Sequence, residues 1–193
     1  MAQAATWTPA NAVTLGRIAL VPIFAWTLLE AADDDVAWRL VSTGLFVLAA
    51  LTDRLDGHLA RSRGEVTPLG VVLDPIADKL LVGAALVLLS TQDRVAWWVT
   101  VVILGREVGI TLWRFALLRS QIVPASRGGK VKTVVQSVAI GLLLLPLTHL
   151  PVVVARVADV VLWLAVAITV ATGADYLVRG VRARRAQREV AGT

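Results

Sequence analysis

Four aspartates stand close together in a chain that is otherwise strongly apolar. Asp53 and Asp56 follow one apolar run, and Asp74 and Asp78 interrupt the next. On a helix of 3.6 residues per turn, spacings of three and four residues place side chains on one face. Two helices joined by a short loop run antiparallel, so the two acidic faces can meet. The pattern therefore predicts that four carboxylates converge on one site.

Such a cluster beside a membrane needs cations to offset its charge. A single aspartate inside a membrane-spanning helix costs about 2.5 to 3.5 kcal/mol, and neighbouring like charges add repulsion. The sequence has no cysteine and only two histidines, His58 and His149. The available ligands are hard oxygens, which favour Mg²⁺ or Mn²⁺ over zinc or copper. Four carboxylates suit two divalent ions, the arrangement that stabilises the entering and leaving oxygens of a phosphoryl displacement.

Small and basic residues lie between the aspartates. Gly57 and Gly70 leave room for a bulky group to approach the helix backbones, and Arg61 can pair with a phosphate. Close packing of helices through small residues is an alternative explanation for Gly57 and Ala60. It does not account for four aspartates on matching faces.

The composition indicates an integral membrane protein. Of the 193 residues, 57% are hydrophobic and the mean hydropathy is +0.74, whereas a soluble domain is about 45 to 50% apolar. The apolar runs predict an all-α bundle of six transmembrane helices at 12–29, 37–60, 69–90, 95–118, 131–147 and 152–176. We expect a single membrane domain over residues 1–193, with a short N-terminal segment at 1–11, no signal peptide, and a basic tail at 179–193.

The basic residues predict the orientation of the bundle, because positive residues in short loops stay on the cytoplasmic side. Three connecting or terminal segments carry them: Arg54, Arg61 and Arg63; Arg119, Arg127, Lys130 and Lys132; Arg179, Arg182, Arg184, Arg185 and Arg188. All three fall on one side, so both termini and the acidic site are expected at the cytoplasmic face of the cell membrane. The net charge of +5 is explained by this topology and by anionic lipid headgroups, without nucleic acid.

The spacing of the acidic motif resembles the signature of the CDP-alcohol phosphotransferases. The matching positions are Asp53, Asp56, Gly57, Ala60, Arg61, Gly70, Asp74 and Asp78. The resemblance implies that fold, and a reaction in which an alcohol hydroxyl attacks the phosphate of a CDP-activated substrate and expels CMP. It also implies a homodimer.

The same resemblance implies roles for individual residues. The four aspartates would bind two Mg²⁺ or Mn²⁺ ions, with Asp53 and Asp74 bridging, and Asp78 would also be the general base. The implied contacts to the nucleotide of CDP-diacylglycerol are Gly57, Arg61, Thr67 and Gly70, together with Asn11, Thr14 and Arg17 at the start of the first helix.

A basic group downstream indicates the acceptor. The candidates for binding an acceptor phosphate are Arg106, Arg114, Lys130 and Lys132. A neutral or zwitterionic acceptor would not require several cations, which leaves glycerol 3-phosphate or inositol phosphate. The segments "REVGITLWR" and "GGKVKTVVQ" resemble family members that use sn-glycerol 3-phosphate, which predicts phosphatidylglycerophosphate as the product. Glu107 and Arg114, seven residues apart on one face, could instead form a structural ion pair.

Three other interpretations stay open at this point. Inositol phosphate could be the acceptor in the same chemistry. The acidic residues could line a divalent-cation transporter, although such sites usually lie at the midplane between related repeats, and no repeat is visible. The chain could also be a membrane scaffold without catalysis.

Overall fold

The protein is a bundle of α-helices. The computed structural model describes residues 9–31, 35–63, 68–117 and 127–191; for 9–10, 53–72, 74–75, 113–117, 127–130, 177 and 179–191 it describes the helical backbone alone. These residues form six α-helices, one 3₁₀ turn and no strand. The helices are α1 (Pro9–Glu30), α2 (Val36–Arg63), α3 (Pro68–Thr91), α4 (Trp97–Leu117), α5 (Arg127–Leu144) and α6 (Val152–Ala191), with the 3₁₀ turn η1 (Leu147–His149) between the last two. The predicted all-α architecture of six helices is confirmed for the described residues.

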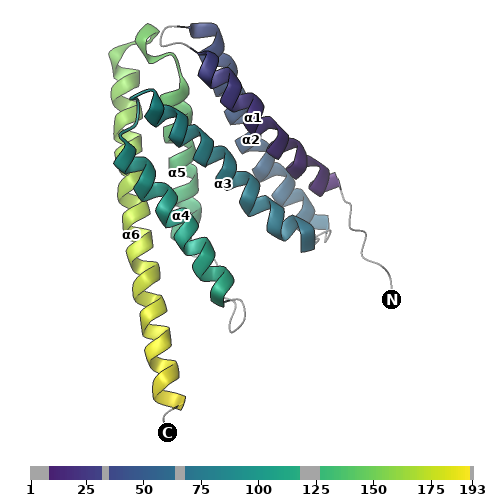
Figure 1. Cartoon of the computed structure of the whole chain (residues 1–193), viewed down its shortest axis with the longest axis vertical. Coiled ribbons are helices and arrows are strands. Elements are labelled where there is room, and N and C mark those ends of the chain that lie inside the picture. Colours follow the sequence, from purple (N-terminus) through teal and green to yellow (C-terminus); the bar gives the residue numbers. More distant parts are fainter. Residues whose placement is uncertain (1–8, 32–34, 64–67, 118–126, 192–193) are drawn as a thin grey trace.

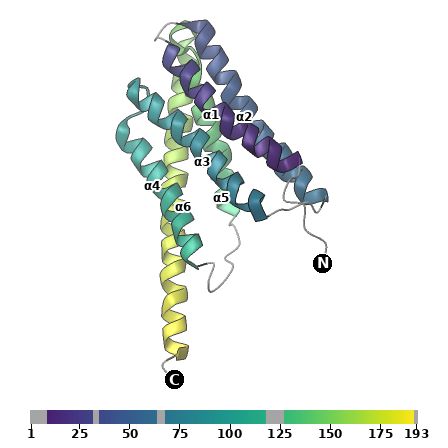
Figure 2. The same ribbon diagram turned by 45° about the vertical axis from the view of Figure 1, so that its right-hand side comes forward.

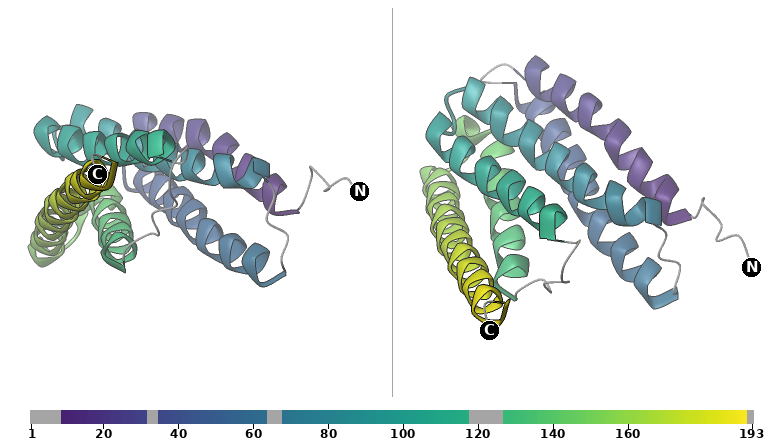
Figure 3. Two further views of the ribbon diagram at one scale, coloured as in Figure 1. Left: turned by 90° about the horizontal axis from the view of Figure 1, so that it is seen from below. Right: turned by 60° about the horizontal axis from the view of Figure 1, so that its bottom comes forward.

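Successive helices run in opposite directions along the bundle (Figure 1). Helix α1 packs along both α2 and α3, α5 packs along α6, and α4 lies against α3 and α6. The C-terminal ends of α1, α3 and α5 and the starts of α2, α4 and α6 lie at one end of the bundle, here called the turn end (Figures 1 and 2). The starts of α1, α3 and α5 and the C-terminal ends of α2 and α4 lie at the other end, here called the motif end, where the helices spread apart (Figure 3).

Among the residues whose side chains are described, the buried apolar core lies mainly in the half of the bundle nearer the turn end. Every helix contributes to it, with buried side chains that include Phe24, Leu28, Phe46, Leu86, Leu89, Val99, Ile103, Ile140, Leu144 and Leu162. The aromatic rings of Phe24 and Phe46, 6.0 Å apart, join α1 to α2 within it.

Polar side chains form hydrogen bonds that connect the helices at the turn end. Arg39, fully buried on α2, donates a hydrogen bond to Oε1 of Gln92 (2.9 Å), and Nε2 of Gln92 donates to the carbonyl oxygen of Leu28 (2.9 Å). Arg94 donates to the carbonyl oxygens of Leu143 and Leu145 at 3.4 and 3.1 Å. Buried carbonyl groups require such partners. The bonds tie α1, α2, α3 and the end of α5 together at one level.

Local backbone signals explain where α2 begins and α3 ends. Oδ1 of Asp35 accepts hydrogen bonds from the backbone amides of Ala37 and Trp38 (3.0 and 3.1 Å), which caps the start of α2. Asp93 has a φ of 57°, and the following amide of Arg94 bonds the carbonyl oxygen of Leu89 at 2.9 Å. This left-handed residue with a 6→1 bond is the usual way to terminate a helix.

The outer surface carries many large apolar side chains, among them Trp26, Leu29, Leu48, Leu51, Val101, Val153, Val160 and Trp163. Extended exposed apolar surface of this kind marks contact with a membrane. Two described segments are long and apolar enough to span it, Asn11–Glu30 and Val152–Tyr176, while Val36–Thr52 and Val131–Leu144 are shorter apolar segments. The motif aspartates and the charged residues of α4 and α5 shorten the other apolar runs, so six spans remain a prediction.

Helix α6 extends well beyond its apolar part. It covers 40 residues, which at 1.5 Å per residue is about 60 Å, roughly twice the thickness of a bilayer core. The sequence predicted a helix ending at Tyr176 and a basic tail from residue 179, but the helical backbone continues through that tail to Ala191. Its last turns project past the motif end of the bundle (Figure 1).

Candidate active site

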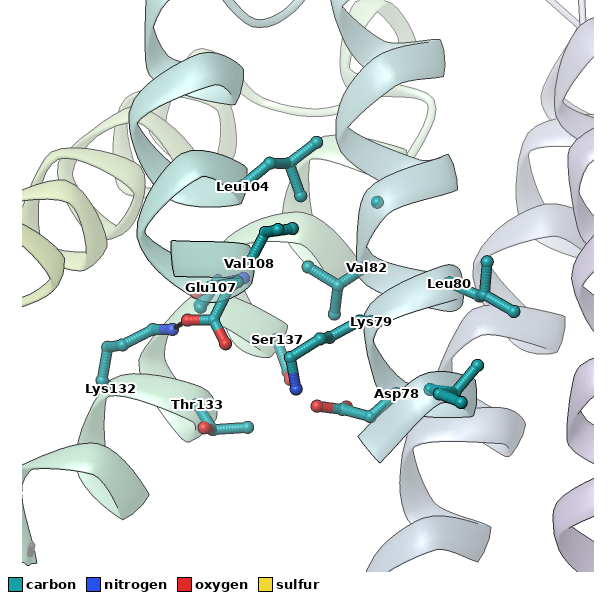
Figure 4. A pocket seen from close by; sticks show the side chains of 13 residues that line it. Asp78, Lys79, Leu80, Val82, Leu104, Glu107, Val108, Lys132, Thr133 and Ser137 are labelled. Carbon is teal, nitrogen blue, oxygen red and sulfur yellow. Dashed lines mark ion pairs between the residues drawn. The ribbon is translucent and has the colours of Figure 1, made fainter. Parts of the chain in front are cut away.

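A cavity of about 320 Å³ opens between α3, α4 and α5. Two carboxylates and two ammonium groups line it: Asp78 and Lys79 on α3, Glu107 on α4 and Lys132 on α5. Figure 4 shows Asp78, Lys79 and Glu107 directed into the space between these helices. The remaining wall combines apolar side chains such as Val82 and Leu104 with the polar Thr133, Gln136 and Ser137. The cavity therefore offers both signs of charge to a small polar ligand.

Asp78 reaches this cavity from the motif end of α3. The helix begins at Pro68, where a missing backbone donor costs little. Asp74 lies in the same helix one turn before Asp78, and the backbones of Asp53 and Asp56 lie in the last part of α2. The predicted placement of the acidic motif on two antiparallel helices is confirmed at the level of the backbone.

Whether the four aspartates suit a metal ion depends on the chemistry of their carboxylate groups. Of the four predicted ligands, only Asp78 has a described side chain, and among described side chains no three histidine, cysteine or acidic residues gather closely enough to hold an ion. The carboxylate of Asp78 lines the cavity from a helix that also carries Asp74 one turn earlier. Carboxylates without thiolates suit a hard divalent cation, so the residues present fit Mg²⁺ or Mn²⁺.

Lys132 is held in place by Glu107. Its side chain is only 2% exposed, and its ammonium group forms an ion pair with Oε1 of Glu107 across α4 and α5 (Figure 4). A buried ammonium without a partner would be strongly unfavourable. The pair thus fixes the position of the lysine on the cavity wall.

Arg106 faces α6 and does not line the cavity. Its Nη1 donates to the same Glu107 oxygen at 2.9 Å, and its Nη2 donates to Oγ1 of Thr172 at 3.2 Å. A methyl group on Gly173 would lie 3.3 Å from the Arg106 side chain, so the arginine packs closely on α6 at that glycine. Glu107 therefore bridges Arg106 and Lys132. Its described partners come from α4 and α5, and the side chain of Arg114 lies outside the described part.

The three predicted nucleotide contacts on α1 are buried. Asn11, Thr14 and Arg17 are 1 to 3% exposed and lie at the motif end of this helix. Because α1 packs on both α2 and α3, it borders the two helices that carry the aspartates. The side chains of Gly57, Arg61, Thr67, Gly70 and Lys130, the other predicted contacts, lie outside the described residues.

A second, apolar pocket of about 260 Å³ lies between α2 and α5. Its wall includes Phe46, Leu51, Val138 and Gly141. Ser137 lines this pocket and the charged cavity alike, so the two adjoin on α5. A ligand with a polar head and an apolar tail could occupy both.

Sequence reasoning missed four polar residues of the charged cavity: Lys79, Thr133, Gln136 and Ser137. Lys79 directly follows the acidic motif, where its charge could have marked it as a candidate. Gln136 follows Lys132 by four residues, a spacing that places both on one face of α5. This spacing was the available signal.

Comparison with known proteins gives one consistent result. A sequence model of the CDP-alcohol phosphatidyltransferase family matches residues 7–171. A protein of Mycobacterium tuberculosis named probable phosphatidylglycerophosphate synthase is 49% identical over 173 residues, covering 90% of this chain and 81% of that protein. The protein of Bacillus subtilis named CDP-diacylglycerol--glycerol-3-phosphate 3-phosphatidyltransferase is 40% identical over 176 residues, covering 86% of this chain and 91% of its own. One of the same name from Rickettsia felis is 36% identical over 168 residues, with the same two coverages.

Proposed function

Because this chain belongs to the CDP-alcohol phosphatidyltransferase family, we propose that it transfers the phosphatidyl group of CDP-diacylglycerol to sn-glycerol 3-phosphate. The products are phosphatidylglycerophosphate and CMP. The names of the similar proteins from M. tuberculosis and B. subtilis support this acceptor. The observation that carries the mechanism is that Asp78 and Lys132, from helices far apart in the sequence, line one cavity.

In this reaction Asp78 is the general base. It takes the proton from the primary hydroxyl of glycerol 3-phosphate, and the hydroxyl oxygen forms a bond to the phosphorus that bears the diacylglycerol. The bond from that phosphorus to the CMP oxygen breaks, and CMP leaves with the electron pair. Divalent ions, which this family generally uses, would be held by Asp53, Asp56, Asp74 and Asp78 and would supply stabilisation of the charge that develops on the phosphate.

The cationic groups bind the two substrates. Lys132, positioned by Glu107, takes the phosphate of the acceptor, because an ammonium on a cavity wall is a suitable partner for a small anion. Arg114 and Lys130 add to the basic surroundings of that phosphate, whereas Arg106, which faces α6, contributes only through its ion pair with Glu107. Arg61, Gly57, Gly70 and Thr67 contact the nucleotide diphosphate, with Asn11, Thr14 and Arg17 approaching from α1.

The apolar pocket between α2 and α5 receives an acyl chain of CDP-diacylglycerol. It adjoins the charged cavity at Ser137, so a lipid phosphate and its tail can lie on the two sides of this residue. This arrangement matches an amphipathic substrate that enters from the membrane.

The same proposal includes the membrane topology. All six helices cross the cell membrane, and the motif end, the active site and both termini lie on the cytoplasmic side, where the water-soluble acceptor glycerol 3-phosphate is available. The basic last turns of α6 contact anionic headgroups or solvent there. The protein acts as a homodimer.

A direct assay tests the proposal. Detergent-solubilised protein with CDP-diacylglycerol should form phosphatidylglycerophosphate and an equal amount of CMP from sn-glycerol 3-phosphate. The reaction should require Mg²⁺ or Mn²⁺ and stop in EDTA. Product from inositol phosphate in place of glycerol 3-phosphate would overturn the acceptor, and full activity in EDTA would overturn the metal assignment.

A further inference from the structure

Gln136 on α5 has an amide oxygen with no hydrogen bond. The side chain is 5% exposed and lines the charged cavity, yet its Oε1 is buried without a hydrogen-bond partner in the described part of the chain. Buried polar atoms of native proteins almost always have partners, so each exception requires an explanation. Here the side chain belongs to the wall of a cavity that can admit a polar ligand.

The position of Gln136 relates it to Lys132. The two residues are four apart on α5, so they lie on one face, displaced by about 6 Å along the helix. Gln136 lies deeper in the bundle than the lysine, toward the buried core residues Ala139 and Ile140. A ligand whose phosphate is bound by Lys132 would extend its carbon chain past the amide.

We propose that Gln136 forms a hydrogen bond with the secondary hydroxyl of glycerol 3-phosphate and thereby determines which acceptors the enzyme accepts. This rests on the proposed function. The secondary hydroxyl keeps its proton throughout the transfer, since the primary hydroxyl is the nucleophile. A hydroxyl both donates and accepts, so it can satisfy either end of the amide. A site built to bond a hydroxyl discriminates against an analogue that lacks it, because the buried amide is then left unpaired.

The test uses an acceptor that lacks one atom. 3-Hydroxypropyl phosphate keeps the phosphate and the reacting primary hydroxyl of glycerol 3-phosphate and lacks only the secondary hydroxyl. The wild-type enzyme should prefer glycerol 3-phosphate by about tenfold in kcat/KM, the size expected for one hydrogen bond. In Gln136→Met, of similar length without a polar atom, the preference should fall to within about twofold. The KM for CDP-diacylglycerol should not change.

A matched control separates polarity from shape. Gly83 lines the same cavity, and a methyl group there would meet Leu104 at an ordinary 3.8 Å, so Gly83→Ala alters the space without adding or removing a polar group. It should keep the wild-type preference. Binding of CDP-diacylglycerol, measured by thermal shift, shows that each variant is folded, and Gln136→Leu replaces the methionine variant if that one is not.

Stereochemistry gives a second readout from the same variants. sn-Glycerol 1-phosphate carries its secondary hydroxyl on the opposite side, so the wild-type enzyme should discriminate against it and Gln136→Met should do so less. If Gln136→Met still prefers glycerol 3-phosphate over both analogues as strongly as the wild type does, the proposed role of Gln136 is wrong, although the proposed function stands. If the wild-type enzyme does not use glycerol 3-phosphate at all, the proposed function fails, and the role of Gln136 fails with it.

Discussion

Lys132 on α5 and Arg106 on α4 share one oxygen of Glu107 as their ion-pair partner. Removing one member of a buried pair leaves the other charge uncompensated, which costs about 3 to 5 kcal/mol. Glu107→Gln should therefore lower the unfolding midpoint markedly. Combined with Lys132→Met, the loss should be smaller than the sum of the two single losses, with a coupling of about 1 to 3 kcal/mol.

Denaturant unfolding in detergent measures this coupling. Val101→Ala, at an exposed apolar residue of α4 that does not line the cavity, is the control and should add independently to Lys132→Met. Strictly additive losses for Glu107→Gln and Lys132→Met would show that the pair does not stabilise the fold.

Asp78→Asn should reduce turnover by about 100-fold or more while leaving CDP-diacylglycerol bound. The amide cannot accept the proton of the attacking hydroxyl, and removing a general base typically costs a factor of 10² to 10⁴. Product formation and substrate-dependent thermal shift measure the two effects separately. Asp159→Asn removes an exposed acid on α6 and should leave both unchanged. Comparable turnover in Asp78→Asn and Asp159→Asn would exclude Asp78 as the base.

Gly141→Leu should weaken the use of long-chain CDP-diacylglycerol. No atom lies within 4 Å of the position where a Cβ would be placed on Gly141, so the leucine side chain can occupy the apolar pocket. Displacing two methylene groups of an acyl chain costs about 0.8 kcal/mol each, which predicts roughly a tenfold higher KM for the lipid. The KM for glycerol 3-phosphate should stay the same.

Acyl-chain length provides the internal check on this pocket. The effect of Gly141→Leu should shrink with a short-chain CDP-diacylglycerol that does not fill the pocket. Gly44→Leu makes the same change on α2, at a glycine that also has open space but does not line the pocket, and should have no effect. Equal effects of the two substitutions would rule out a specific acyl site at α5.

Arg39→Met should destabilise the protein without changing its kinetics. It removes the donor to Gln92 at the turn end and leaves a half-buried acceptor with one partner fewer, at a cost of about 1 kcal/mol. Unfolding should occur at lower temperature, while kcat and both KM values below that temperature remain those of the wild type. Arg156→Met, at an exposed arginine of α6, is the control and should change neither. A large loss of kcat in Arg39→Met would contradict a purely structural role.

Hydropathy and charge predicted most of the helical framework. The starts of α2 and α3 are within one residue of the positions 37 and 69 that the apolar runs predicted. The structure adds that Asp35 caps the start of α2. The end of α6 was missed since hydropathy falls at Tyr176, while the arginines, alanines and glutamine that follow are good helix formers. Apolar patterns detect what a helix buries and not how far its backbone continues.

Only those relationships within the site that involve residues of a single helix could be predicted from the sequence. Spacing on α3 predicted that Asp74 and Asp78 share a face, and the helix contains both. Asp78 and Lys132 line the same cavity because of how α3 and α5 are rotated about their axes, and local sequence does not encode this rotation. The partners of Glu107 were ambiguous for the same reason: Arg114 was one candidate on the same helix, whereas the described contacts are Arg106 and Lys132.

The described core residues near the turn end and the residues of the charged cavity lie on shared helices, α3, α4 and α5. Residues near Phe24, Leu86 and Ile140 hold the helices together, whereas Asp78 and Lys132 stand where the same helices diverge. Because Lys132 and Glu107 form an ion pair between helices and also line the cavity, a substitution at either residue should change the folding free energy and the binding of the proposed acceptor together.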